Sequence, residues 1–347
     1  MELLSAKRVQ SFRAIREEEV LNLVKSISLK KTSPINLSKK MFSLTYGVTA
    51  RAAFGGKTKG QEEFVSIVEE VADMIGGFTI VGMYPSVKLF QVISGIRRTL
   101  KKMHKRIDQI LENVLNEHRE RKRITESGKG EAEEDLVDVL LRIQKHGDLQ
   151  FLLTDNNIKA VILNIINNRR LGNVRNAEKH RSNEKRAQTE VQSIFDKKGN
   201  IDETCLHESK YLNSVIKETL RLHPSAPLLV PRASSEQCMA IRQDPKYWNE
   251  AEKFDPERFL HSEIDFKGRD FEFIPFAAGK RICPGISFAI PNIELPLAHL
   301  LYHFDWKLPD GKKYEELDME EDLGLIVRRK NDLILIPIPY DQSSFFC

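Results

Sequence analysis

Apolar residues recur every three or four positions along most of this 347-residue chain, which is the spacing of a buried helix face. Capping residues, Gly-Gly pairs and prolines mark where several of these stretches begin and end. The predicted helices cover residues 1–28, about 36–54, 64–75, 90–122, 135–143, 154–165 and 207–222, and a buried helix follows residue 285, where Pro291 and Pro296 must kink it or delay its start.

Only a small part of the pattern is strand-like. Leu228-Leu229-Val230 is a short apolar run, and the tail predicts a hairpin that pairs Leu323–Val327 with Leu333–Ile338 across Asn331-Asp332. Residues 250–269 are rich in charge and predict a meandering segment. The expected fold class is mostly α with small β-sheets.

Two stretches interrupt the helical pattern. Phe78–Pro85 is an apolar loop that could contact a membrane, line the entry to a pocket or simply pack on the core. The apolar stripe of residues 158–165 then runs into a polar tract that extends to Arg186. Between Arg169 and Arg186 the chain has seven Lys or Arg and two Glu. An apolar helix therefore leads directly into a polar, basic segment whose composition is typical of a solvent-exposed surface.

Charge and cysteine content exclude several classes of protein. The net charge is +4 from 54 basic and 50 acidic residues, a balance that gives no argument for nucleic acid. The basic run at residues 101–106 predicts a solvated helix face. The cysteines form no pair motif, which argues against a disulfide scaffold or a zinc cluster; they are Cys205, Cys238, Cys283 and Cys347. The start of the chain lacks the apolar core of a signal peptide, and no stretch is a good membrane span.

The stretch Phe271–Gly285 places an aromatic residue, a glycine, a cation and a cysteine at fixed offsets. A cysteine thiolate is a soft ligand for iron, and a helix that begins near Gly285 would favour the thiolate. Arg281 could meet an anionic group on a flat ligand, and Phe276 could pack beside the sulfur of Cys283. A single cysteine in such a loop can equally be an inert buried side chain.

The full pattern Phe-x-x-Gly-x-Arg-x-Cys-x-Gly resembles the haem-binding loop of the cytochrome P450 monooxygenases, and every specified position from Phe276 to Gly285 matches. The pair Glu218 and Arg221 resembles the Glu-x-x-Arg motif of the same family. A later Pro-Glu-Arg-Phe segment supplies Arg258, in the order that the family uses. Leu222-His223-Pro224, Phe254–Phe259 and Pro284-Gly285 look like a plant microsomal member. Glu294–Ala298 and the helices of residues 1–150 look like the branch that often oxidises terpenoids.

The resemblance implies a single but partial cytochrome P450 domain over residues 1–347, with its haem-binding loop at residues 271–291. The cofactor would be haem b, with Cys283 as the axial thiolate and metal ligand. Residues of the family pattern would hold the haem, with Arg281 and Arg232 on the propionates and Phe276 beside the sulfur; this cofactor-binding set is Arg232, Phe276, Gly279, Arg281, Cys283 and Gly285. Three further residues would lock the fold: Glu218, Arg221 and Arg258.

The implied reaction inserts one oxygen atom into a small apolar plant metabolite such as a terpenoid. Electrons would come from NADPH-cytochrome P450 reductase, and no nucleic acid is involved. The family implies the endoplasmic reticulum membrane. No anchor precedes Met1, so membrane association stays open and a cytoplasmic location is the alternative.

The sequence departs from the family pattern in three places. The anchor, the early strands and helices, and the Trp-x-x-x-Arg helix do not precede Met1. At Ile165–Gly172 the central helix lacks the acid–Thr pair that serves dioxygen activation, so no catalytic residue of the pattern is intact. Gln237–Pro245 is too short for the expected strand hairpin. These departures predict an incomplete fold, truncated and internally deleted. They leave two alternatives to the monooxygenase: an inactive fragment that at most binds haem, or a haem-thiolate rearrangement enzyme that needs no dioxygen.

Overall fold

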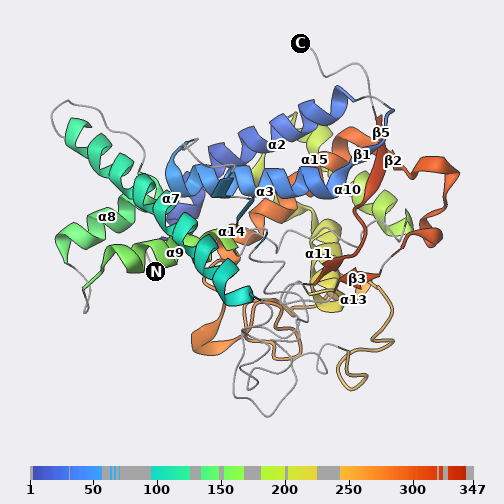
Figure 1. The fold of residues 1–347 in the computed structure, drawn as a ribbon. Helices are drawn as coiled ribbons and strands as arrows, with labels where there is room; N and C mark the ends of the chain where they lie inside the picture. Colours follow the sequence, from blue (N-terminus) through green and yellow to red (C-terminus); the bar gives the residue numbers. More distant parts are fainter. Residues whose placement is uncertain are drawn as a thin grey trace. The chain divides into compact units, whose positions relative to one another are not determined.

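The computed structural model describes residues 3–30, 32–56, 63–64, 66–67, 70, 95–125, 134–147, 152–167, 181–199, 202–224, 243–318, 320–322 and 327–340 (Figure 1). The chain divides into two compact units. Unit 1 comprises Met1–Thr45, Arg170–Asp322 and Ile326–Cys347, and unit 2 comprises Tyr46–Arg169 and Leu323–Leu325. The predicted helix over 64–75, the loop at 78–85 and the strand at 228–230 lie wholly or mostly outside the described residues.

Unit 1 is built around one buried helix, α15 (Pro291–His303), which packs against three longer helices of the unit and against the short helix that precedes it. Almost every residue from Ile293 to Leu301 is buried, as expected for a mostly apolar helix in the core. Pro291 occupies the first turn of α15 and Pro296 lies inside it. The predicted delay is therefore confirmed, because only the four-residue α14 (Ile286–Ala289) precedes the proline. The three longer helices packed on α15 are α2 (Arg13–Ser28), α10 (Arg181–Lys198) and α11 (Lys210–Leu222), and α14 also contacts it.

Helix α10 was not predicted from the sequence. Its apolar face consists of Ala187, Val191 and Phe195, which recur every fourth position in an otherwise polar segment. Gln188 adds a buried polar contact, because its side-chain amide donates to the carbonyl oxygens of Leu301 at 3.0 Å and Phe304 at 3.3 Å. So narrow an apolar stripe gives only a weak periodic signal in the sequence. The helix is stabilised mainly by its packing against α15.

The remaining short elements of unit 1 surround this core. The predicted first helix breaks at Phe12, which separates α1 (Ala6–Ser11) from α2. Helix α13 (Glu257–Leu260) lies in the segment that was predicted to meander. The other short turns are 3-10 helices at Glu203–Glu208, Gly279–Arg281, Pro309–Gly311 and Tyr314–Glu316.

A three-stranded antiparallel sheet has the order β1 (Ile35–Asn36), β5 (Ile334–Pro339), β2 (Phe304–Lys307). Ile35 lies opposite Leu335, and Phe304 lies opposite Pro339. The strand predicted at 333–338 is confirmed, and β5 pairs with strands that are distant in sequence. Its predicted partner, Leu323–Val327, lies mostly outside the described residues. A separate two-stranded pairing joins β3 (Glu321–Asp322) to β4 (Arg328–Arg329).

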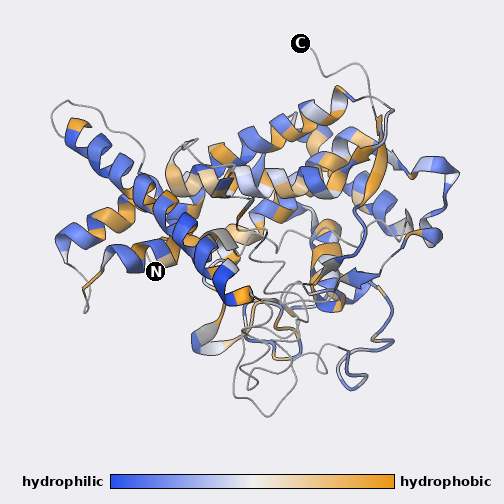
Figure 2. Ribbon diagram, in the orientation of Figure 1, coloured by the Kyte–Doolittle hydropathy of each residue, from blue (hydrophilic) through white to orange (hydrophobic). Residues whose placement is uncertain are grey.

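Unit 2 contains three described helices that contact one another: α7 (Ile96–Thr125), α8 (Leu136–His146) and α9 (Asp155–Asn167). Helix α3 (Leu37–Phe54) contributes residues to both units. The buried side of α7 carries Met103, Ile107, Leu111 and Val114, while its other side is polar and is coloured blue in Figure 2. The long helical stripe predicted for this segment is therefore confirmed.

Helix α8 begins where its sequence predicts and extends three residues beyond the predicted end, to His146. The carboxylate of Asp135 accepts a hydrogen bond from the Asp138 amide at 2.8 Å, which caps the first turn. The other oxygen of Asp135 lies 2.9 Å from Nε2 of the buried His118 on α7. Asp135 therefore both starts α8 and joins it to α7. Helix α9 likewise starts at the predicted cap, where Thr154 accepts a hydrogen bond from the Asn157 amide at 3.3 Å.

Gly55 ends α3 in a conformation that only glycine adopts without strain. Its φ is +69°, and a Cβ at this position would lie 2.7 Å from Oδ2 of Asp135. We expect Gly55→Ala to lower the free energy of unfolding by about 2 kcal/mol, because it adds both backbone strain and a clash with the α8 cap. Gly56→Ala is the matched control, since no atom lies within 4 Å of where its Cβ would stand. Equal midpoints for the two variants in urea denaturation would contradict this account.

Two histidines of α15 make unit 1 sensitive to acid. Burial lowers the pKa of His299 to about 3 and that of His303 to about 4, from an ordinary value of 6.5. Below pH 6.5 the unfolded chain takes up protons that the folded chain does not, so stability falls as pH falls, by up to about 1.4 kcal/mol per pH unit for each histidine. Urea denaturation at pH 7 and pH 5 should show a smaller loss for His299→Gln than for the wild type. The same substitution at the exposed His104 should leave the loss unchanged.

Candidate functional site

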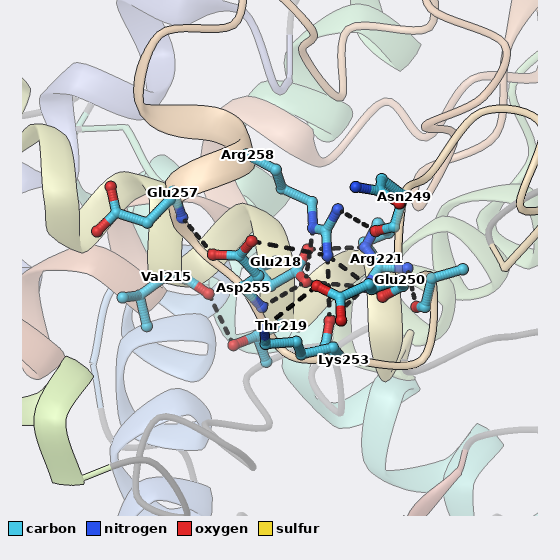
Figure 3. A network of polar contacts seen from close by, with 11 residues as sticks. Val215, Glu218, Thr219, Arg221, Asn249, Glu250, Lys253, Asp255, Glu257 and Arg258 are labelled. Atoms are coloured by element: carbon cyan, nitrogen blue, oxygen red, sulfur yellow. Dashed lines mark hydrogen bonds and ion pairs between the residues drawn. The ribbon is translucent and has the colours of Figure 1, made fainter.

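Glu218 and Arg221 form a buried ion pair on α11. Residues three apart lie on the same face of a helix, and here both side chains are 0% exposed. Two parallel hydrogen bonds join them, from Nε of Arg221 to Oε2 of Glu218 at 2.7 Å and from Nη2 to Oε1 at 2.8 Å (Figure 3). The pair is thus the bidentate arrangement that balances two charges most completely.

Arg258 of α13 reaches the same carboxylate, as the sequence pattern predicts. Its Nε donates to Oε1 of Glu218 at 3.1 Å, and the Asp255 amide donates to the same oxygen at 2.8 Å. The spare donors of the two arginines are satisfied by backbone carbonyls, those of Ala251 and Asn249 among them. The structure therefore brings together all three residues that the sequence placed in this network.

An aromatic cluster lies between this network and the cysteine loop. Trp248, whose ring lies 5.3 Å from the guanidinium carbon of Arg221, packs against Phe259 and Phe273 with ring centroids 5.6 and 6.4 Å away. Phe273 is completely buried and begins the segment that leads to Cys283. Neither Trp248 nor Phe273 was predicted to support the site. Their signal was only that of large apolar residues, which does not separate a supporting residue from ordinary core.

The loop from Phe276 to Cys283 is closed by a backbone hydrogen bond. The Cys283 amide donates to the Phe276 carbonyl at 2.9 Å, and the Ile282 amide donates to the Gly279 carbonyl at 3.1 Å. Gly279 has a φ of +64°, with no atom within 4 Å of where a Cβ would stand. The Phe276 ring is buried and meets Phe266 edge to face, with centroids 5.7 Å apart. The predicted loop residues therefore share one compact turn.

Gly268 packs closely against this turn, and its role was not predicted from the sequence. Its φ is +76°, and a Cβ there would lie 2.8 Å from Cδ1 of Ile282 and 3.3 Å from the Ala277 carbonyl oxygen. A side chain at this position would push the cysteine loop outward. The sequence signal was a glycine among charged residues, which predicts a turn but not what packs on it.

Cys283 has a half-buried free thiol. Burial raises the pKa of this thiol, and a hydrogen bond from the Gly285 backbone lowers it by a smaller amount. The expectation that a following helix favours the thiolate is therefore outweighed by burial, since α14 has only four residues. A Cβ on Gly285 would lie 3.6 Å from Sγ, which is an ordinary van der Waals contact, so the sulfur is not crowded on this side. A free, uncrowded thiol that accepts one hydrogen bond from a backbone amide fits the role of an axial ligand of haem iron. Binding to the iron would remove the proton from the sulfur.

Some predicted site residues lie outside what the structure describes. Arg232 falls outside the described residues, and the side chain of Arg281 does as well. Helix α9 is described as far as Asn167, and the polar tract that follows is outside the described range until Arg181. The propionate contacts and the oxygen side of the pocket therefore stay predictions from the sequence.

A second group of possible metal ligands lies in unit 2, where His118, Asp135 and Asp138 have donor atoms within 4.8 Å of one another. Two cations already lie against this group. Nη2 of Arg121 is 2.7 Å from Nε2 of His118, and Nζ of Lys122 donates to the Asp138 carbonyl at 2.9 Å. A metal ion would have to displace these charges, so we assign the group to the packing of α7 on α8.

Comparisons with known proteins identify the class. A family model described as Cytochrome P450 matches residues 1–168, 178–239 and 237–336. Cytochrome P450 71D10 of Glycine max is 51% identical, over 97% of this chain and 71% of its own length. Tabersonine 16-hydroxylase 2 of Catharanthus roseus is 47% identical, over 99% of this chain and 73% of its own length, and premnaspirodiene oxygenase of Hyoscyamus muticus is 41% identical, over 99% and 73%.

The fold agrees with this assignment. A solved zebra fish cytochrome P450 with abiraterone superimposes with a TM-score of 0.76, at 19% identity, over 96% of this chain and 78% of that protein. The chain belongs to the cytochrome P450 family, whose members are haem-thiolate monooxygenases, so its cofactor is haem with a thiolate-bound iron. Plant members are typically anchored in the endoplasmic reticulum and use NADPH-cytochrome P450 reductase. Among the described residues, the helices are all too short or too polar to cross a bilayer.

The interruptions in the family match coincide with two of the departures seen in the sequence. The match stops after residue 168 and resumes at 178, and its last two segments meet at 237–239. The alignment with the Glycine max relative extends over 373 residues although this chain has only 347, so parts of the relative have no counterpart here. The segment after residue 168 and the segment near residue 240 are therefore the two places where the match to the family model is interrupted.

Breaking the Glu218 network should strongly destabilise the fold. Glu218→Gln leaves the buried Arg221 guanidinium without a counter-charge, and we expect a loss of about 3–5 kcal/mol in the free energy of unfolding. Glu120→Gln is the control, because Glu120 and Arg123 have the same three-residue separation but are 65% and 80% exposed. That variant should change the free energy by less than about 0.5 kcal/mol in urea denaturation. Similar losses for the two variants would show that burial of the Glu218 pair is not the cause.

Proposed function

We propose that this protein is a haem-thiolate monooxygenase that inserts one oxygen atom into a small apolar plant metabolite, with terpenoids as the substrate class. Relatives named for oxygenation of premnaspirodiene and for hydroxylation or epoxidation of tabersonine support a plant metabolite as substrate. We choose terpenoids because Glu294–Ala298 and the helices of residues 1–150 resemble the family branch that often oxidises them.

The observation that carries the proposal is the free thiol of Cys283 in a loop that is closed by its own backbone hydrogen bond to Phe276. Cys283 would ligate the iron, and Phe276 would pack beside the sulfur. Gly279 and Gly285 would leave room for the porphyrin edge, and Arg281 would meet a propionate, with Arg232 on the other. Glu218, Arg221 and Arg258 would hold the supporting fold rather than take part in the reaction.

Bound haem supplies the oxidising chemistry of the family. The residues of this chain would act on the proximal side, where Cys283 releases its proton and donates electron density to the iron. The half-buried position of the sulfur limits its contact with water, and the Gly285 amide stabilises its negative charge. A fixed hydrogen bond to the sulfur is a means by which proteins tune an iron centre.

The sequence at Ile165–Gly172 supports two alternatives to this activity, because it has no acid–Thr pair to deliver protons to dioxygen. One is a catalytically inactive chain that at most binds haem. The other is a rearrangement enzyme that acts on a peroxide substrate without a reductase. The family match runs through both units, which supports a single, partial cytochrome P450 domain. We propose the endoplasmic reticulum as the location of an anchored form and the cytoplasm as that of an unanchored one.

Haem ligation is tested by a reduced, carbon monoxide difference spectrum of the purified, haem-supplemented protein. We expect a red-shifted thiolate band that disappears in Cys283→Ala, because the substitution removes the sulfur ligand. Cys205→Ala is the control, since Cys205 is a buried free cysteine in another segment, and it should retain the band. A folded wild-type sample without the band, or with a band that survives Cys283→Ala, would contradict the ligand assignment.

Turnover assays separate the three functions. A monooxygenase forms product from a terpenoid panel only with NADPH and added reductase. A rearrangement enzyme converts a fatty-acid hydroperoxide without reductase, and an inactive haem protein does neither while keeping the thiolate band.

A further inference from the structure

The first three turns of α7 gather cations on their exposed side, and only one of these cations has an acidic partner among the described residues. From Ile96 the first acidic residue on the helix is Asp108. Arg106 is paired with Glu63 at 2.6 Å, but five other cations make no ion pair with an acidic residue of the described chain. We refer to these five exposed residues as the basic stripe: Arg97, Arg98, Lys101, Lys102 and Lys105.

Helix geometry places the stripe in two adjacent rows. Residues four apart lie above one another, so Arg97, Lys101 and Lys105 form one row, and Arg98 and Lys102 form the other. The stripe therefore runs for about 12 Å along the helix. The opposite face of α7 carries the buried residues Met103 and Ile107, which keeps both rows on the solvent side.

This arrangement is electrostatically unfavourable for a helix on its own. Like charges four residues apart repel each other, and cations at a helix N-terminus lie at the positive end of the helix dipole. The first turn of α7 has no acidic residue that would offset either effect. An anionic surface would remove both sources of repulsion.

In the C-terminal half of α7, by contrast, cations have partners within the protein. There Arg119 pairs with Asp155 at 2.6 Å, and Lys122 donates to the Asp138 carbonyl at 2.9 Å. Cations of the C-terminal half thus have partners within unit 2, whereas those of the stripe face outward.

We propose that the basic stripe binds the phosphate groups of anionic phospholipids at a membrane surface. Two parallel rows of cations on a straight helix match a flat array of phosphates, and basic clusters on one helix face are a recognised means of binding acidic lipids. The near-neutral balance of the whole chain fits a local contact of this kind rather than a general affinity for polyanions. The stripe would act independently of haem binding and of any membrane anchor.

Vesicle flotation of the full chain tests the proposal. The wild type should bind phosphatidylcholine vesicles that contain phosphatidylserine more tightly than pure phosphatidylcholine vesicles. Replacing one row, with Arg97→Gln, Lys101→Gln and Lys105→Gln together, should weaken binding to the anionic vesicles roughly 100-fold. In 1 M salt, where the screening length falls to about 3 Å, the difference between the two vesicle types should disappear.

A matched variant separates the stripe from net charge. Lys7→Gln, Lys25→Gln and Lys30→Gln together remove the same charge from exposed positions scattered over α1, α2 and the segment after them, and should leave binding unchanged. Circular dichroism of both triple variants checks that the helices are retained. Equal loss in the two variants, equal binding of the wild type to both vesicle types, or no binding at all would overturn the proposal; the last result would point to an acidic protein surface instead.

Discussion

The carboxylate of Glu218 is out of reach of water, so its charge has to be balanced by protein groups. Arg221, Arg258 and the Asp255 amide provide that balance through four hydrogen bonds to its two oxygens. The arginines in turn satisfy backbone carbonyls of residues 249–253, a stretch without regular secondary structure. One buried anion therefore fixes the end of α11, the start of α13 and the irregular segment between residues 249 and 258.

An aromatic cluster connects this network to the segment that leads to the cysteine loop. Trp248 packs on Arg221, and Phe273 packs on Trp248 and Phe259, a short distance before the turn that ends at Cys283. A thiol that is to ligate a metal has to be held in place without being crowded. The hydrogen bond between Cys283 and Phe276 holds the loop in place, and the absence of a side chain at Gly268 leaves room for Ile282 beside it.

Much of this arrangement could be predicted from the sequence, because it depends on short-range spacing. A separation of three residues put Glu218 beside Arg221, and capping residues located the starts of α8 and α9. The parts that were missed depend on contacts between distant segments. Helix α10 has only three apolar residues on its packed face, β5 pairs with strands from both ends of unit 1, and the role of Gly268 follows only from what packs against it.

The central claim is a bond between the sulfur of Cys283 and haem iron. Iron X-ray absorption of the haem-supplemented ferric protein measures that bond directly, since sulfur and the lighter ligands differ in distance and scattering. We expect one sulfur ligand in the wild type and in Cys205→Ser, and its replacement by a nitrogen or oxygen ligand in Cys283→Ser. A wild-type spectrum without iron-bound sulfur, or a sulfur ligand that persists in Cys283→Ser, would contradict that claim.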